Sequence, residues 1–160
     1  MKLGDVMKME GPKGRLEYNG NGKFTILKKQ ISGKTKIGCI AGGTGITPCY
    51  QVIQAALLNG GDGTNLSLVF GNRTPADILM KDELINFGKN YKDKFNLFLT
   101  VDIQPDIVEK WEQGVGFITK DMLQKSMPAP SPDTLILYCG PPPFEKMMKE
   151  HLTALGYGDD

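Results

Sequence analysis

Short apolar runs alternate with helical patterns over most of the chain. The continuous apolar runs are Ile37–Ala41, Leu66–Phe70, Phe95–Val101 and Leu135–Cys139. Runs of this kind are typical of strands buried on both faces, and a separation of about 30–40 residues is typical of β-α-β units. The sequence therefore predicts an α/β fold in which a doubly wound parallel sheet of about five strands is flanked by helices.

The first two predicted helices begin with the same signal. At Thr47-Pro48 and again at Thr74-Pro75, a capping hydroxyl precedes a proline that suits the first helical position. Apolar residues then recur at helical spacing, in the first case until the Asn59–Gly61 turn. Asp77 lies three positions after Thr74 and predicts a capping box there.

Two further helices are expected near the end of the chain. One should follow Thr119, and the other should cover about residues 144–155 and end at Gly156. The apolar faces of these helices favour packing against the sheet rather than ligand binding.

The first 34 residues differ from the rest because Gly and Lys dominate them and no helix-length apolar pattern occurs. Two short alternating pieces, Asp5–Met9 and Gly14–Tyr18, predict a β ribbon. Residues 1–34 are therefore expected to form a unit separate from residues 35–160.

Composition places the chain among ordinary globular domains. It has 160 residues, of which 40% are hydrophobic and 23% charged, which suits about one domain. The sequence contains no apolar stretch of about 18 residues and no signal-peptide pattern at its start, so a cytoplasmic location without a membrane segment in this chain is expected.

Charge is balanced overall and uneven along the chain. The net charge of +1 predicts no binding to nucleic acid. Residues 1–36 carry nine basic and three acidic side chains, and residues 37–160 carry ten and fifteen. This asymmetry is compatible with a docking surface for an acidic partner and equally with a solvated lysine-rich segment.

Cysteine and histidine content excludes several classes of site. Three cysteines, Cys39, Cys49 and Cys139, form no CxxC pair and no zinc spacing, and their odd number argues against a disulfide framework. His151 is the single histidine, so a Ser-His-Asp or Cys-His hydrolase site cannot be assembled. No metal site is predicted.

The first loop with chemical potential follows the first parallel strand. Residues 42–48, here called the glycine loop, read Gly-Gly-Thr-Gly-Ile-Thr-Pro. Its glycines let backbone N–H groups approach an anion, and Thr44 and Thr47 add hydroxyl donors near a helix N-terminus. The loop suits a phosphate or pyrophosphate, but a merely tight strand-to-helix turn would need similar residues. It lacks the Gly-Lys-Ser/Thr ending of a P-loop.

The second such loop follows the fourth apolar run. Residues 139–144, here called the proline loop, read Cys-Gly-Pro-Pro-Pro-Phe. Three successive prolines make it stiff. If the fourth strand adjoins the first, as in doubly wound sheets, the two loops are neighbours. Cys139 then lies in the cleft, although a buried apolar role is equally open on the sequence alone.

The two loops together resemble the pyridine-nucleotide half of the cytochrome b5 reductase family, within the ferredoxin-reductase-like superfamily. The similarity is especially close to the reductase domain at the C-terminal end of assimilatory nitrate reductases. Four other segments agree with this resemblance: Gly11–Gly14, Asn72–Thr74 with Asp77–Leu79, Val101-Asp102, and Gly114–Phe117.

The resemblance implies a two-domain flavoprotein in which NADH gives a hydride to FAD, which passes electrons to a haem protein such as cytochrome b5. Cys139 would lie beside the nicotinamide and help to orient it, without being a nucleophile. The resemblance assigns the pyrophosphate region of NADH to Gly42, Gly43, Thr44 and Gly45, the flavin side to Thr47 and Pro48, and the adjacent wall to Gly140, Pro141, Pro142 and Phe144.

Two more residues belong to the adenosine end by this resemblance. Asp102 matches the acidic position that favours NADH, because a carboxylate accepts a bond from the ribose 2′-OH and repels a 2′-phosphate. Phe117 would contact the adenosine. The alternatives are a solvated loop acid for Asp102 and a core aromatic residue for Phe117, while Trp111 is expected to serve packing.

The chain also departs from the family pattern. The flavin-binding Arg-x-Tyr-Ser/Thr motif is absent from the sequence. Residues 1–34 are therefore expected to be the last strands of a flavin-binding barrel with its linker, and residues 35–160 an NADH-binding domain without its final strand. Alone, such a fragment should be inactive without its flavin domain. A reductase domain of a nitrate reductase and a nucleotide-binding module without activity are the alternatives. A parent protein anchored to the cytosolic face of a membrane is compatible with this reading.

Overall fold

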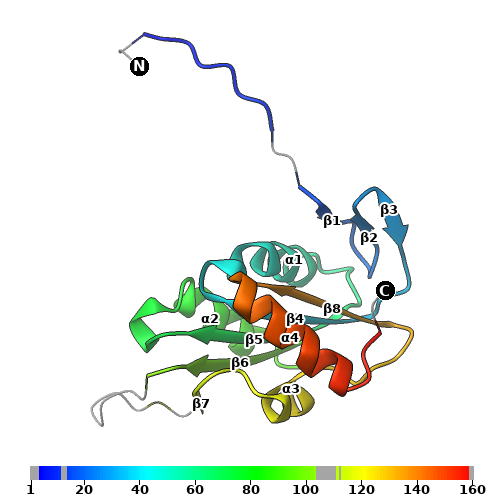
Figure 1. The fold of residues 1–160 in the computed structure, drawn as a ribbon. Helices are drawn as coiled ribbons and strands as arrows, with labels where there is room; N and C mark the ends of the chain where they lie inside the picture. The colour runs from blue at the N-terminus through cyan, green and yellow to red at the C-terminus, as the bar shows by residue number, and fades with distance from the viewer. Residues whose placement is uncertain (1–3, 12–13, 104–110, 112, 159–160) are drawn as a thin grey trace.

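The computed structural model describes residues 4–11, 14–103, 111 and 113–158 (Figure 1). In this part of the chain five strands form an all-parallel sheet in the order β7-β6-β5-β4-β8. The predicted α/β fold with a doubly wound sheet is confirmed, and β8 adjoins β4 as expected. The strands are β4 (Lys36–Gly42), β5 (Asn65–Asn72), β6 (Phe95–Val101), β7 (Gly114–Val115) and β8 (Thr134–Cys139).

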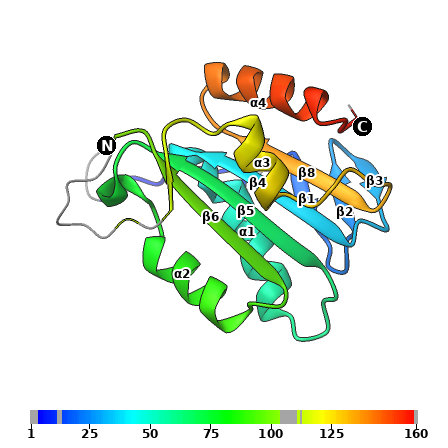
Figure 2. The same cartoon turned by 90° about the horizontal axis from the view of Figure 1, so that it is seen from below.

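Helices cover both faces of this sheet (Figure 2). One face packs against α1 (Ile46–Leu58) and α2 (Lys81–Asn90), and the other against α3 (Lys120–Ser126) and α4 (Pro142–Ala154). Side chains alternate between the two cores along β4: Cys39 and Ala41 join the α1 side, whereas Ile40 joins the α4 side. This alternation explains why the strands are continuous apolar runs, since both faces are buried.

A small antiparallel sheet precedes the parallel one. It contains β1 (Leu16–Tyr18), β2 (Phe24–Ile26) and β3 (Lys29–Ile31) in that order. The predicted ribbon is thus confirmed for the end of Gly14–Tyr18. It is wrong for Asp5–Met9, where no strand forms and Val6 is 97% exposed. Alternation there lacks a neighbouring strand and an apolar surface to cover its side chains, and both are needed to hold a strand. Pro12 and Lys13, from the Gly11–Gly14 segment, lie outside the described residues.

Asp62 fastens the small sheet to the loop after α1. Asp62 is 1% exposed, and its carboxylate accepts hydrogen bonds from Tyr18 Oη at 2.6 Å, Asn21 N at 2.9 Å and Thr64 N at 3.0 Å. Burial alone would raise the pKa of Asp62, but the hydrogen bonds from Thr64, Tyr18 and Asn21 outweigh it and lower the pKa. We call this cluster the Asp62 latch.

Two predicted helix starts are wrong in detail. Residues Gly43–Gly45 form a 3-10 turn, η1, which continues directly into α1 at Ile46, so Thr47 lies inside the first turn. Its hydroxyl donates to Thr44 O at 3.3 Å instead of capping the helix. Pro48 is tolerated because the N–H groups of a first turn have no intrahelical acceptor.

The second predicted helix, expected to begin after Thr74, is divided into two helices. Thr74 and Asp77 form the predicted capping box, but it closes only the short 3-10 helix η2 (Pro75–Asp77). The left-handed backbone of Met80 then separates η2 from α2. The cap at Thr119 is confirmed, since its side chain accepts from Met122 N at 3.2 Å.

The last helix is close to its predicted bounds. α4 begins at Pro142, slightly before the predicted start at Phe144, because prolines suit the first turn of a helix. It ends ahead of Gly156, whose φ of +85° suits a residue without a side chain. Among the described residues, no helix has the length and apolarity needed to cross a membrane.

Candidate functional site

The glycine loop and the proline loop are in direct contact. A Cβ placed on Gly45 would lie 2.5 Å from the carbonyl carbon of Cys139 and 2.9 Å from Gly140 N. Only a residue without a side chain allows the start of α1 to approach the end of β8 this closely. The structure therefore brings together the two loops that the sequence singled out.

Phe144 closes the space between the loops. Its ring lies 3.1 Å from the position that a Cβ on Gly42 would occupy, and its Cγ lies 2.9 Å from the corresponding position on Gly140. The ring is only half-buried, so one side of this wall remains accessible. Pro141 and Pro142 are exposed next to it at the start of α4.

The rim of the glycine loop is open. A Cβ on Gly43 would meet no atom within 4 Å, and the φ of Gly43 is +54°. Thr44 and Thr47 are exposed beside it, whereas Gly42 and Gly45 are buried. The residues at the N-terminus of a 13-residue helix thus border accessible space, an arrangement that favours a phosphate group.

A small cavity lies on the Cys139 side of the contact. Its volume is about 230 Å³, and its lining includes Leu16 from β1, Pro48 and Cys49 from α1, and Cys139. Burial raises the pKa of the Cys139 thiol, and Cys49 and Glu145 raise it further. The thiol is therefore protonated at neutral pH, which suits van der Waals contact with a ring better than nucleophilic attack.

Cys49 and Leu16 were missed by sequence reasoning. Cys49 is 2% exposed and lies one helical turn after Gly45, on the same side of α1. A hydrogen bond with Cys49, together with burial, raises the pKa of Cys39 well above the usual thiol range. The helical spacing from Gly45 was a usable signal for Cys49, but nothing in the sequence indicates that β1 reaches this cavity.

Asp102 and Phe117 lie farther along the same edge of the sheet. Asp102 follows β6 and Phe117 follows β7, so neither is in the loop contact itself. Phe117 is 68% exposed and is not the core aromatic residue of the alternative reading. Partial burial raises the pKa of Asp102, and the charge of Arg73 opposes this shift.

Asn72, at the end of β5, is a further residue that sequence reasoning did not place. It is 6% exposed, and both polar atoms of its side-chain amide are buried without a hydrogen-bond partner among the described residues. Unpaired buried amides are rare, and a functional site is one of the settings in which they occur. Together with the open space at Gly43, this fits a polar ligand at the carboxyl edge of the sheet.

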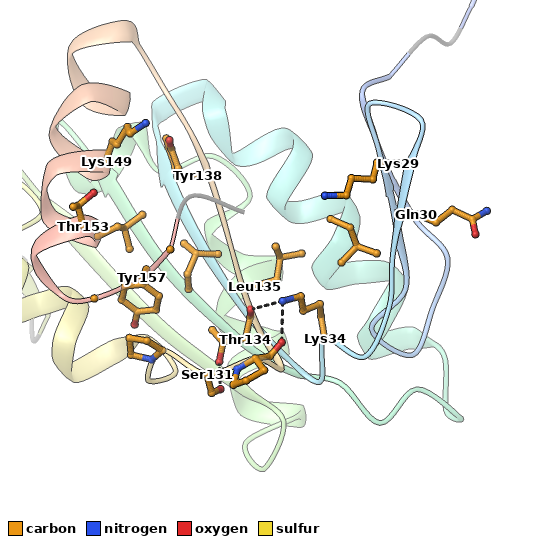
Figure 3. A pocket seen from close by; sticks show the side chains of 17 residues that line it. Lys29, Gln30, Lys34, Ser131, Thr134, Leu135, Tyr138, Lys149, Thr153 and Tyr157 are labelled. Atoms are coloured by element: carbon orange, nitrogen blue, oxygen red, sulfur yellow. Dashed lines mark hydrogen bonds between the residues drawn. The ribbon is translucent and has the colours of Figure 1, made fainter.

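A larger groove than the small cavity beside Cys139 lies elsewhere. It has a volume of about 990 Å³ and runs along the free edge of β8, between β3 and α4 (Figure 3). Lys34 lines this groove, and its Nζ donates to Pro132 O at 2.9 Å and to Thr134 O at 3.3 Å (Figure 3). No residue of the glycine loop or proline loop lines it.

Comparison with known proteins identifies the larger part of the chain. A family profile described as "Oxidoreductase NAD-binding domain" matches residues 39–150. The chain belongs to this family. This oxidoreductase NAD-binding domain is 43% identical to NADH-cytochrome b5 reductase 1 of Mycosarcoma maydis, over 98% of the chain and 44% of that protein. It is 44% identical to inducible nitrate reductase [NADH] 1 of Glycine max, over 98% of the chain and 17% of that protein.

A solved structure supports the same family assignment. The cytochrome b5 reductase domain of Ulva prolifera nitrate reductase superposes with a TM-score of 0.87 at 35% identity, covering 94% of this chain and 56% of that one. The resemblance predicted from the two loops is thus confirmed. The NAD-binding domain spans about half the length of the cytochrome b5 reductases that it matches.

Proposed function

We propose that this chain is the NADH-binding part of a flavoprotein reductase of the cytochrome b5 reductase type. The observation that carries the proposal is the contact of Gly45 with Cys139, which joins an anion-binding loop to a thiol-containing wall. The similarity to NADH-cytochrome b5 reductases and to nitrate reductases over 98% of the chain or more supports it.

The glycine loop would bind the pyrophosphate of NADH. Gly43 and Thr44 offer backbone N–H groups at the open rim, while Gly42 and Gly45 allow the loop to pack against Phe144 and Cys139. The N-terminus of α1 adds a favourable potential for the two negative phosphates.

The proline loop would hold the nicotinamide. Cys139 presents a protonated thiol to the ring, and Gly140, Pro141, Pro142 and Phe144 form a stiff wall that keeps the ring in one orientation. Thr47 and Pro48 would face the flavin side. When bound, FAD supplies the chemistry of accepting a hydride and releasing electrons singly.

The adenosine would extend along the sheet edge. Asp102 would accept a hydrogen bond from the ribose 2′-OH, and the exposed ring of Phe117 would contact the adenine. These two assignments also account for why both side chains remain near the surface.

Residues 1–34 would be the end of the flavin-binding barrel and its linker, and residues 35–160 the NADH-binding domain. The separate antiparallel sheet of β1, β2 and β3 supports this division. The Asp62 latch and the cavity between Leu16 and Cys139 show that the small sheet nevertheless packs beside the site. In the whole protein, the electron acceptor would be cytochrome b5 or another haem domain. The similarity to the Ulva prolifera structure also favours a haem domain of a nitrate reductase as acceptor.

Colour and NADH binding of the purified chain test the proposal. Yellow protein that reduces ferricyanide with NADH would show that this chain carries the activity itself. Colourless protein that binds NADH in an equimolar ratio is the result expected for the domain alone, with activity restored by the flavin-binding part of a relative. A folded chain that does not bind NADH would overturn the proposal.

A further inference from the structure

Arg73 and Asp102 lie side by side at the ends of neighbouring strands. Asn72 pairs with Val101 in the register of β5 and β6, so Arg73 and Asp102 are the next pair along. Two backbone hydrogen bonds hold them there: Asp102 N donates to Asn72 O at 2.9 Å, and Ile103 N donates to Arg73 O at 3.0 Å. Both side chains are exposed, and the positive charge of Arg73 acts on Asp102.

Arg73 also lies between Asp102 and the glycine loop. β5 separates β4 from β6, and Gly42 at the end of β4 is in register with Gly71, two residues before Arg73. Adjacent strands are about 4.8 Å apart. A dinucleotide that binds the glycine loop with its pyrophosphate and Asp102 with its ribose must therefore pass the end of β5 at Arg73.

Among the described residues, Asp102 is an acid on which the charge of Arg73 acts. Asp77, which follows on the same loop, accepts two hydrogen bonds from Thr74, at 3.0 Å from the backbone N and 2.7 Å from the hydroxyl. A guanidinium group presents a planar set of donors that matches the oxygens of a phosphate. Next to Asp102 this group is partly compensated and is not available in full to a second anion.

We propose that Arg73, beside Asp102, is a second specificity-determining residue of this site. Arg73 binds the 2′-phosphate of an NADPH-type nucleotide when Asp102 does not engage its guanidinium group. The proposal rests on the proposed function. It predicts that Asp102 disfavours a 2′-phosphate in two ways, by repelling it directly and by occupying Arg73. Removing Asp102 then does more than remove a repulsion, because it also releases a phosphate-binding group.

The test compares 5′-AMP with 2′,5′-ADP (adenosine 2′,5′-bisphosphate), which differ by the 2′-phosphate alone, using isothermal titration calorimetry on the unmodified chain and its variants. Asp102→Ser should raise the affinity for 2′,5′-ADP by about tenfold or more, the scale of one charge-assisted phosphate contact. Arg73→Gln alone should lower it by less than the gain from Asp102→Ser, because Asp102 already compensates part of the Arg73 charge, and should change 5′-AMP affinity by less than about twofold. In the double variant, most of the gain from Asp102→Ser should disappear.

The matched control is Arg15→Gln, which removes the same charge from an exposed position on the small sheet and should change neither affinity. An equal gain from Asp102→Ser with and without Arg73 would overturn the inference and leave the proposed function intact. Failure of the folded, unmodified chain to bind 5′-AMP, 2′,5′-ADP and NADH would overturn both.

Discussion

The backbone of Gly45 packs against the carbonyl group of Cys139, with no room for a side chain between them. This contact joins the first turn of α1 to the end of β8 and makes one site of two loops that are far apart in the sequence. Its tightness also makes the site sensitive to a single methyl group.

Gly45→Ala should separate the loops. The added Cβ cannot be accommodated by a side-chain rotation, because the atoms it meets belong to the Cys139–Gly140 backbone. We expect a loss of about 3 kcal/mol in the free energy of unfolding, at the upper end of overpacking effects, measured by urea denaturation. Gly60→Ala is the control, since its Cβ would meet open space, and a similar loss in both variants would contradict the close contact.

Gly43→Ala tests the contribution of Gly43 to NADH binding separately from its contribution to stability. Its Cβ enters open space, so the stability cost should be that of a left-handed alanine, about 1–2 kcal/mol. NADH affinity measured by calorimetry should fall by about tenfold or more, because the methyl group occupies the approach to the backbone N–H groups. Gly33→Ala has a similar φ and open surroundings on the linker after β3, so it should show the stability cost alone. Equal NADH affinity in the two variants would remove Gly43 from the site.

Much of the fold follows from local sequence signals. The four apolar runs became β4, β5, β6 and β8, and the adjacency of β4 and β8 that brings the loops together follows from doubly wound topology. The start of α1 could not be predicted from Thr47-Pro48, because η1 depends on the contact of Gly45 with a strand about 90 residues later in the sequence.

Other site features required the register of the sheet. The Arg73–Asp102 pair exists because Asn72 and Val101 are partners across β5 and β6, which no pattern in the sequence specifies. The same holds for the Asp62 latch, since the hydrogen bond from Tyr18 depends on how the small sheet docks. Asp5–Met9 shows the opposite case, in which a local alternating pattern does not form a strand.

Asp62→Asn should change how stability depends on pH. The pKa of Asp62 is lowered in the folded chain, so its carboxylate stabilises the fold above the unfolded pKa of about 3.9. This contribution is lost as the pH falls through the folded pKa. At pH 7 the variant should be less stable by about 2 kcal/mol, the scale of hydrogen bonds to a charged group.

Urea denaturation from pH 7 to pH 2 checks this. The difference between the unmodified chain and Asp62→Asn should begin to shrink below about pH 4, where Asp62 becomes protonated in the unfolded chain, and should shrink further as the pH falls through the lower pKa of the folded chain. Asp93→Asn, which removes an exposed carboxylate after α2, should behave like the unmodified chain at pH 7. A difference that stays constant over the whole range would show that the charge of Asp62 does not matter.

Cys139 should react slowly with iodoacetamide at neutral pH. Its pKa is raised by burial, by Cys49 and by Glu145, so the reactive thiolate forms at higher pH than that of an ordinary thiol. The rate of alkylation, followed by mass spectrometry of the Cys139 peptide, should therefore rise at higher pH than for free cysteine. Glu145→Gln should shift this rise to lower pH. A midpoint at or below that of free cysteine would contradict the protonated thiol.

The most direct test of the central claim is a titration of the ¹⁵N-labelled chain with NADH, followed by amide chemical shifts. Binding at the joined loops predicts saturable shifts at Gly43, Thr44 and Gly45 together with Cys139 and Gly140, all with one dissociation constant. Shifts confined to the groove along β8, for example at Lys34 and Thr134, or no shifts in the folded chain, would contradict it.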